Sequence, residues 1–331
     1  MKSRTLLSLP LPMAAMLAVS SCGAGTGEPA SAVNSAGAEA PAVLASFYPL
    51  QYVAEKVGGD RVQVRSLTPP GAEPHDLELS PNAVAGLEGA DLVIYLSGFQ
   101  PAVDDAVSRT SPKHVIDAAA AAGMKEAAAN PAEEKHQGHG HAETGAETHA
   151  EDGHAGHDHA AVDPHFWLDP LRLADIAHEV AHELGAVDPE NADAYEANAV
   201  AVSEELTVLD EEFATGLASC QRDTIVVSHE AYGYLADKYG LKQVAIAGLE
   251  PDTEPSPARL AEIGQTVKDE DVTTVFSESL VNPRVAQTLA DDLGIETAVL
   301  DPVEAQTDES KDYQQVMREN LAALQTALDC A

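Results

Sequence analysis

The stretch TIVVSHEAYGYLADKYGLKQVAI, residues 224–246, decides the fold class. An apolar run at Thr224–Ser228 predicts a strand, residues 231–239 show helical spacing, and Gln243–Ile246 predicts a second strand. Strands that alternate with helices over so few residues are typical of a parallel sheet with helices on its faces. The alternation continues toward the C-terminus: we expect strands at Thr273–Phe276 and Thr297–Leu300, and helices at 256–268, 284–292 and 309–328.

The N-terminal half shows the same alternation from Ala42 onward. We expect strands at Val43–Phe47, Val62–Leu67, Leu92–Leu96 and His114–Ile116, with helices at Gln51–Val57, Pro81–Leu87 and Pro101–Val107. Helical spacing returns at 170–185 and again at Asn191–Leu217. At 1.5 Å per residue the second of these helices would be about 40 Å long, enough to cross from one lobe to another. The sequence therefore predicts two similar α/β lobes joined by one long helix.

Composition and charge exclude one large class of partner. The chain has 331 residues, which allows about two domains, and 44% of them are hydrophobic, which is enough for a packed core. Lys and Arg number 18 against 55 Asp and Glu, so the net charge is −37. A nucleic-acid backbone carries charge of the same sign, so we expect no nucleic acid to bind.

The N-terminus has the pattern of an export signal. A short basic start precedes an apolar stretch, Leu6–Val19, that is too short for a membrane span, and small residues then lead to Cys22. This arrangement resembles the lipobox of bacterial lipoproteins, which implies removal of residues 1–21 and lipidation of Cys22. An ordinary secretory signal with an incidental cysteine is the alternative. Residues 22–41 are rich in Gly, Ala and Ser and predict a flexible tether; no transmembrane helix is expected elsewhere.

Two further cysteines, Cys220 and Cys330, are expected to form a disulfide, because an exported chain folds in an oxidising compartment. Two buried free thiols are the alternative. The bond would tie the C-terminal helix to the start of the second lobe. Closing a loop of about 110 residues contributes on the order of 4–5 kcal/mol if the effect is entropic.

Residues 125–161 interrupt the α/β pattern. They contain no Val, Ile, Leu, Met or aromatic residue, so they cannot bury enough apolar surface to fold, and we expect a disordered loop. His-rich tracts bind borderline metals such as Zn²⁺, so the loop predicts secondary metal capture. Seven of the thirteen histidines lie in it: His136, His139, His141, His149, His154, His157 and His159.

Three other histidines lie where strands lead into loops. His75 follows the second strand, and His165 lies where the His-rich loop rejoins the fold. In the second lobe His229 follows the first strand and Asp301 follows the last. Ligands of open α/β sheets bind outside the carboxyl ends of strands, so two ligands from each lobe would meet in one cleft. Three imidazoles and one carboxylate form a tetrahedral set suited to Zn²⁺.

These motifs resemble one family, the zinc-specific solute-binding receptors of metal ABC importers, also called cluster A-I or cluster 9. The similar segments are FYPL (47–50), GAEPHDLELSP (71–81), DPHFWLDP (163–170), VVSHEAYGYLADKYGL (226–241) and FSESLVNPRVAQTLADDLG (276–294). The resemblance covers residues 42–330. It implies two Rossmann-like lobes, each with a four-stranded parallel sheet, joined by a long rigid α-helix.

The resemblance also implies the ligands, which are His75, His165, His229 and Asp301. Related manganese receptors carry a Glu at the place of His229, so the imidazole favours zinc. The fourth ligand varies in the family, and Glu278, Glu73 or water are alternatives to Asp301.

By the same resemblance the protein is no enzyme. It is expected to be a monomer that delivers Zn²⁺, its transported ligand, to an ABC permease and its ATPase. Its place would be outside the cytoplasm, on the outer face of the cell membrane, or in the periplasm where an outer membrane is present. The expected parts are a signal peptide at 1–21, a tether at 22–41, an N-terminal lobe at 42–188, a linking helix at 189–217 and a C-terminal lobe at 218–331.

Two other functions fit parts of the sequence. HEVAHELGAVD, residues 178–188, matches a zinc-protease pattern in which His178, His182 and Asp188 would bind the metal and Glu179 would be the general base. The same spacing of charged and apolar residues is that of an amphipathic surface helix, which we expect here because no Met-turn follows. A His-rich zinc buffer would need only residues 136–159 and no cleft.

Overall fold

The computed structural model describes residues 40–124 and 162–331, which belong to one compact unit, Ala40–Ala331. The signal peptide, the lipidation site Cys22, most of the tether and the seven histidines of the His-rich segment lie outside the described residues, so the expectations about them stay predictions. None of the described helices is long and apolar enough to cross a membrane.

The first sheet has four parallel strands in the order β2-β1-β3-β4. They are β1 (Ala42–Ala45), β2 (Gln63–Ser66), β3 (Leu92–Tyr95) and β4 (Val115–Asp117). Successive side chains point to opposite faces of the pleat. Leu44 and Val93 pack toward α2 (Pro81–Glu88) and α3 (Pro101–Thr110), whereas Val43 and Ile94 pack toward α1 (Tyr48–Gly58) and α5 (Pro170–Val187). The buried faces on both sides make this the helix-sheet-helix layer that the alternation predicts.

The second sheet repeats the first, in the order β6-β5-β7-β8. Its strands are β5 (Thr224–Val227), β6 (Lys242–Ala245), β7 (Thr274–Ser277) and β8 (Glu296–Val299). Val226 and Val275 pack toward α8 (Pro257–Asp269) and α9 (Arg284–Leu293). Ile225 and Phe276 point the other way, into the core that contains residues of α7 (Gly233–Tyr239) and α10 (Tyr313–Leu328). The expectation of two four-stranded parallel sheets is confirmed.

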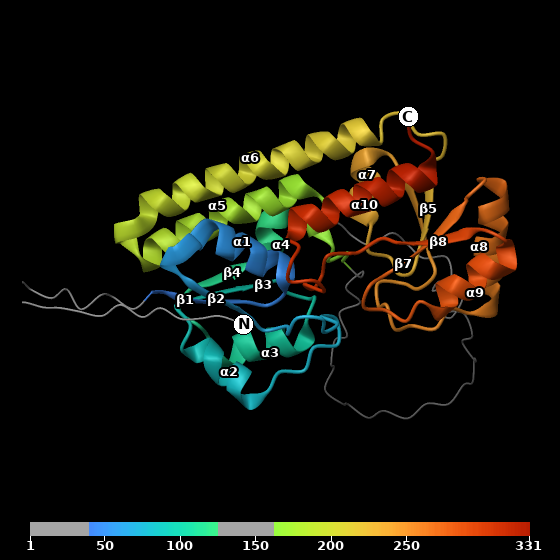
Figure 1. Cartoon of the computed structure of the whole chain (residues 1–331). Helices are drawn as coiled ribbons and strands as arrows, with labels where there is room; N and C mark the ends of the chain where they lie inside the picture. The colour runs from blue at the N-terminus through green and yellow to red at the C-terminus, as the bar shows by residue number, and fades with distance from the viewer. Residues whose placement is uncertain (1–39, 125–161) are drawn as a thin grey trace, which may run out of the picture. The chain divides into compact units, whose positions relative to one another are not determined.

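The long helix α6 (Ala192–Gly216) has 25 residues and contacts α1 and α5 of the first lobe and α10 of the second (Figure 1). Its buried residues belong to one hydrophobic core that also includes Val43 and Phe47 of the first lobe and Val227 and Leu324 of the second. The side chain of Gln314 on α10 adds a polar tie, because its amide donates to Tyr52 Oη at 2.8 Å and to Glu205 Oε2 at 2.7 Å. The two lobes are therefore packed together along α6 rather than joined by a bare linker.

The expected elements are present, with differences at their ends. Strands are shifted by one or two residues, α7 starts at Gly233 instead of 231, and α10 starts at Tyr313 instead of 309. The later start of α10 follows from a capping box: Asp312 accepts from the backbone of Gln315, whose side chain accepts from the backbone of Asp312. A short helix, α4 (Ala118–Ala122), was not expected. The disulfide between Cys220 and Cys330 is present, as predicted.

Candidate metal centre

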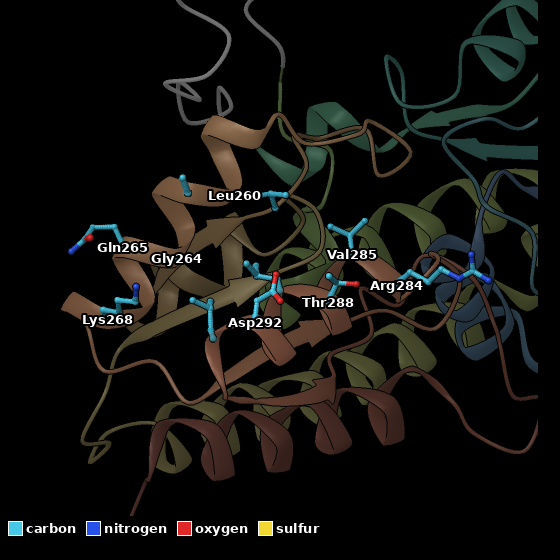
Figure 2. Close-up of a pocket in the computed structure, with 11 residues that line it drawn as sticks. Leu260, Gly264, Gln265, Lys268, Arg284, Val285, Thr288 and Asp292 are labelled. Carbon is cyan, nitrogen blue, oxygen red and sulfur yellow. The ribbon is translucent and has the colours of Figure 1, made fainter.

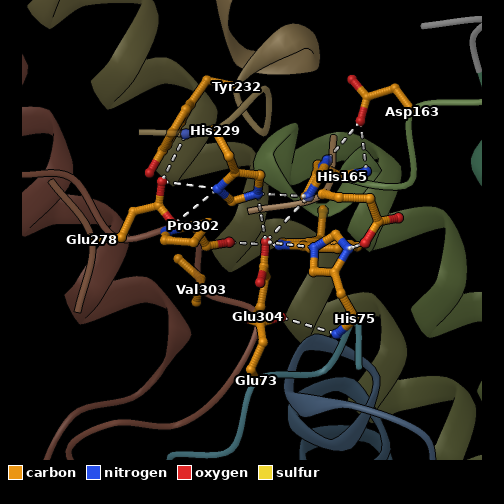
Figure 3. A network of polar contacts seen from close by, with 12 residues as sticks. Glu73, His75, Asp163, His165, His229, Tyr232, Glu278, Pro302, Val303 and Glu304 are labelled. Atoms are coloured by element: carbon orange, nitrogen blue, oxygen red, sulfur yellow. Dashed lines mark hydrogen bonds and ion pairs between the residues drawn. The ribbon is translucent and has the colours of Figure 1, made fainter. Parts of the chain in front are cut away.

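Four segments from both lobes bring His75, His165, His229 and Glu304 together (Figure 3). His75 lies in the loop after β2, His165 precedes the short 3₁₀ helix Phe166–Leu168, and His229 lies just beyond β5. Glu304 lies in the loop after β8. All four residues are buried, and one ligand atom from each lies within 4.8 Å of the others. Among residues 40–124 and 162–331 this is the one group of three or more such side chains that could hold a metal ion.

His165 and His229 are oriented in the same way, each by a carboxylate that contacts both its backbone N–H and its Nδ1. Asp163 Oδ1 accepts from the backbone N–H of His165 at 2.9 Å and lies 2.8 Å from its Nδ1. Glu278 Oε1 likewise accepts from the backbone N–H of His229 at 3.2 Å and lies 2.9 Å from its Nδ1. An ionised carboxylate only accepts hydrogen bonds, so each Nδ1 carries a proton, and the neutral form of each ring has its lone pair on Nε2. Both Nε2 atoms therefore face the centre as metal ligands require.

His75 is held differently. Its backbone N–H donates to Glu73 Oε1 at 2.9 Å, and its ring packs edge-on against Phe99, with ring centroids 4.8 Å apart. Gln100 follows Phe99 in the sequence, and its side-chain amide donates to the carbonyl of Pro74 at 3.1 Å. This bond fixes the loop just before His75. These contacts place the His75 Nε2 atom 3.5 Å from Glu304 Oε1.

The spacing of the ligand atoms fits a tetrahedral zinc ion. Glu304 Oε1 lies 3.1 Å from His165 Nε2 and 3.3 Å from His229 Nε2, and these two nitrogens are 3.3 Å apart. Zn–N and Zn–O bonds of about 2.0–2.2 Å place neighbouring ligands of a tetrahedron about 3.3–3.6 Å apart. Glu304 Oε1 and His75 Nε2 are buried atoms without a hydrogen bond. Buried polar atoms without partners are rare in proteins, and a shared cation would satisfy both of these.

The charges at this centre favour a cation. Burial alone would lower the pKa of His165 and His229, but the carboxylates of Asp163, Glu278 and Glu304 raise both above 6.5. Burial would raise the pKa of Glu304, yet the three imidazoles hold it well below 4.5. The lone pairs and negative charge that attract protons to these nitrogens would equally attract a divalent metal, so protons and metal compete for one place.

The carboxylate that the structure brings to the three histidines is Glu304, and not Asp301 as expected from the sequence. Asp301 Oδ1 accepts from the backbone N–H of Val303 at 2.8 Å, and Asn320 brackets the Asp301 backbone with bonds of 2.9 and 2.6 Å. Val303 has φ of 57°, a left-handed conformation that is uncommon for a β-branched residue. Asp301 therefore shapes a tight turn, and the turn directs the next carboxylate, Glu304, into the centre.

The two other carboxylates considered for the fourth position lie beside the ligand atoms rather than among them. Glu278 contacts His229 through Nδ1, and Glu73 contacts the backbone of His75. A small cavity next to the centre is lined by Glu73, Glu278, Asp301 and Glu304. Glu304 was missed from sequence because it lies five residues beyond the end of β8 (Glu296–Val299). The available signal was a second carboxylate in the same loop, DPVE.

The protease-like motif lies on α5, as an amphipathic helix. Ile176, Val180 and Leu184 are fully buried, whereas the His178 side chain is 48% exposed and contacts Ser203 Oγ through Nε2 at 3.1 Å. Asp188 Oδ2 accepts from Tyr195 Oη at 2.8 Å and from Asn191 at 2.7 Å. The ligands that the protease-like motif would use are thus exposed or already hydrogen-bonded. Among the described residues they do not form a group of three side chains that could hold a metal ion.

A wider hollow lies away from these histidines, between α8 and α9 (Figure 2). It has a volume of about 640 Å³, and the residues that line it include the apolar Leu260, Val285 and Leu289. Its lining contains neither of the two residue types, histidine and cysteine, that make up most zinc sites.

Comparison with known proteins gives consistent results. Residues 43–327 match the sequence model of the family described as zinc-uptake complex component A, periplasmic. The chain is 35% identical to the zinc-binding lipoprotein AdcA of Streptococcus pneumoniae serotype 4 over 292 residues, which cover 87% of this chain and 56% of AdcA. It is 34% identical to the high-affinity zinc uptake system protein ZnuA of Bacillus subtilis, over 86% of this chain and 87% of that protein.

A solved structure extends the likeness to three dimensions. The crystal structure of Zn(II)-bound AdcA from Streptococcus pneumoniae superposes with a TM-score of 0.70 and 32% identity, over 88% of this chain and 58% of that one. The chain thus spans only about half the length of the AdcA relatives that it matches.

Proposed function

The chain belongs to the family of periplasmic zinc-uptake components, and from this membership we propose that it is a receptor that captures one Zn²⁺ between its lobes and delivers it to an ABC importer. The family consists of solute-binding transport proteins and not of enzymes. The observation that carries the proposal is the buried group of three imidazole nitrogens and one carboxylate oxygen within 4.8 Å of one another.

The ligand set itself favours capture over catalysis. We assign His75, His165, His229 and Glu304 as the four ligands, and four protein ligands fill the tetrahedral shell of Zn²⁺. A catalytic zinc site keeps one position open for water, which this set would not leave. Imidazole-rich sets suit zinc, whereas manganese prefers carboxylate and water oxygens.

Delivery requires partners and a location, which we propose as follows. Cys22 carries a lipid anchor, so the receptor stays at the outer face of the membrane beside the permease and its ATPase. The seven histidines between His136 and His159 raise the local zinc concentration and pass ions toward His165, at the foot of that segment. Both points rest on the sequence pattern.

The alternatives have less support. A metalloprotease would need His178, His182 and Asp188 to converge, yet His178 is half exposed and Asp188 is bonded to Tyr195 and Asn191. A His-rich buffer would need no buried, oriented cleft, yet two carboxylates orient His165 and His229.

The test is a competition titration of the purified chain with zinc and manganese, combined with metal analysis. We expect one tightly bound Zn²⁺ per chain, weaker additional equivalents, and a much weaker response to Mn²⁺. Many equal zinc sites would instead support the buffer, and chelator-sensitive cleavage of a peptide library would support the protease. Absence of a tight zinc site would refute the receptor.

A further inference from the structure

The three histidines differ in what faces their Nδ1 atoms. His165 and His229 each meet a carboxylate from their own lobe, and both of these carboxylates are largely buried. His75 instead faces Glu250, whose Oε2 lies 3.9 Å from His75 Nδ1. The His75 side chain is 3% exposed and that of Glu250 is 70% exposed. One of the three imidazoles thus faces a carboxylate that is reachable from solvent.

The His75–Glu250 contact also joins the two lobes. His75 lies in the loop after β2, and Glu250 lies in the loop after β6. These strands occupy equivalent edge positions, β2 next to β1 and β6 next to β5. The loops of the two edge strands therefore meet across the metal centre, and the carboxylate of one reaches the imidazole of the other.

The distance has a specific consequence. Hydrogen bonds from nitrogen to oxygen are about 2.7–3.2 Å long, so 3.9 Å leaves a gap of roughly 1 Å. When Nε2 of a histidine binds a metal, its Nδ1–H is regularly donated to a carboxylate, a carbonyl or water, and this fixes the ring. A movement of roughly 1 Å between the two loops would let Glu250 accept that proton.

We propose that Glu250 is a positioning residue that latches His75 from across the lobes: it accepts the Nδ1–H of His75 when zinc is bound at Nε2, and its withdrawal lets His75 leave the metal first. The inference rests on the proposed zinc site and adds which ligand is released first and what controls its release. His165 and His229 keep their buried partners throughout, so they form the fixed part of the site.

The test compares three variants of the full chain by stopped-flow kinetics of zinc release to a chelator. Glu250→Ala should speed release on the order of 10-fold, because loss of an outer partner of a ligand costs about 10–100-fold in affinity. Glu250→Gln keeps an oxygen that accepts from Nδ1 and should restore most of the slow release. Glu254→Ala is the matched control, because it removes an exposed charge from the same loop without a contact to the ligands.

A second readout separates positioning from attraction by charge. Lost electrostatic attraction slows zinc capture and should affect Glu250→Ala and Glu254→Ala alike. Lost positioning changes release, and it should change the absorption bands of bound Co²⁺ in Glu250→Ala only. Matching thermal midpoints of the variants in the zinc-free state confirm that each one folds.

Three outcomes would overturn the latch. They are equal release from Glu250→Ala and Glu254→Ala, equally fast release from Glu250→Gln and Glu250→Ala, and unchanged Co²⁺ bands. The proposed function fails separately, if the wild-type chain lacks a tight zinc site.

Discussion

Two groups of histidines in this chain share residue types and differ in surroundings. The group at the metal centre is buried, comes from four separate segments, and has its rings oriented by Asp163 and Glu278. The group on α5, His178 and His182, lies four residues apart on one helix, and its residues are exposed. The difference teaches that ligand spacing along a chain is weak evidence, whereas converging, desolvated and oriented nitrogens are strong evidence for a metal site.

The strongest test of this comparison replaces one ring of the buried group. His229→Ala removes a ligand and leaves Glu278 buried without its partner, so zinc affinity should fall more than 100-fold, beyond the 10–100-fold expected for an outer partner. A competition titration against a chelator measures it. Unchanged affinity would exclude His229 from the site.

The next largest effect should come from pH, which acts on the buried group through its histidines. In the zinc-free fold the pKa values of His165 and His229 are raised above 6.5, so their contribution to stability is complete below pH 6.5 and is lost as the pH rises through the raised values. Zinc must displace these protons, so its affinity rises over the same window, by about tenfold per pH unit for each displaced proton.

Thermal unfolding with zinc and with chelator between pH 5.5 and 8.5 measures this effect. The zinc-free midpoint should fall with rising pH while the increment due to zinc grows. The depressed pKa of Glu304 acts in the opposite sense, because its contribution is lost only as the pH falls below 4.5. A zinc increment that stays constant with pH would contradict the expected competition.

A smaller effect distinguishes the two carboxylates of the loop after β8. Glu304→Gln keeps the shape and removes the charge at the centre, so zinc affinity should fall on the order of 10-fold or more. Asp301→Asn keeps an oxygen that accepts from Val303 N–H, so it should change zinc affinity by less than Glu304→Gln does. Calorimetric titration of both variants checks the ranking. The reverse order would restore Asp301 as the ligand.

The smallest effect belongs to the exposed group. His178→Ala combined with His182→Ala should leave zinc affinity unchanged, and the free energy of unfolding should change by no more than about 0.5 kcal/mol per position, as for most surface substitutions. The same titration and a denaturant melt measure both quantities. Loss of the tight site in this double variant would make α5 the true metal centre.

Sequence patterns predicted the lobes well, because strand-helix alternation is a local signal that buried sheets enforce. The three cleft histidines could be predicted to converge because they follow the ends of strands or re-enter the fold there, and the structure brings them together. Glu304 was not found, since its position depends on the turn made by Asp301, Val303 and Asn320. Asn320 lies on α10, so the turn depends on a contact between parts of the chain that no local pattern reveals.

The start of α7 at Gly233 has a similar cause. The residues just before it turn sharply after His229, where the backbone N–H of Ala231 donates to the carbonyl of His229 and Tyr232 N–H donates to Gln243 on β6. The helical spacing from 231 onward gave no sign of this turn. Local periodicity thus placed the helix, and tertiary contacts set its first residue.

The single core along α6 also limits how this protein could be rearranged in evolution. Separating the lobes at α6 would expose the apolar side chains of this helix, Leu206, Leu209 and Phe213. It would also expose the apolar residues of α1, α5 and α10 that pack in the same core. Neither lobe is a self-sufficient module that could be exchanged or fused alone. New specificities would therefore arise by changes within the loops that carry His75, Glu250 and Glu304, while the two lobes are inherited together.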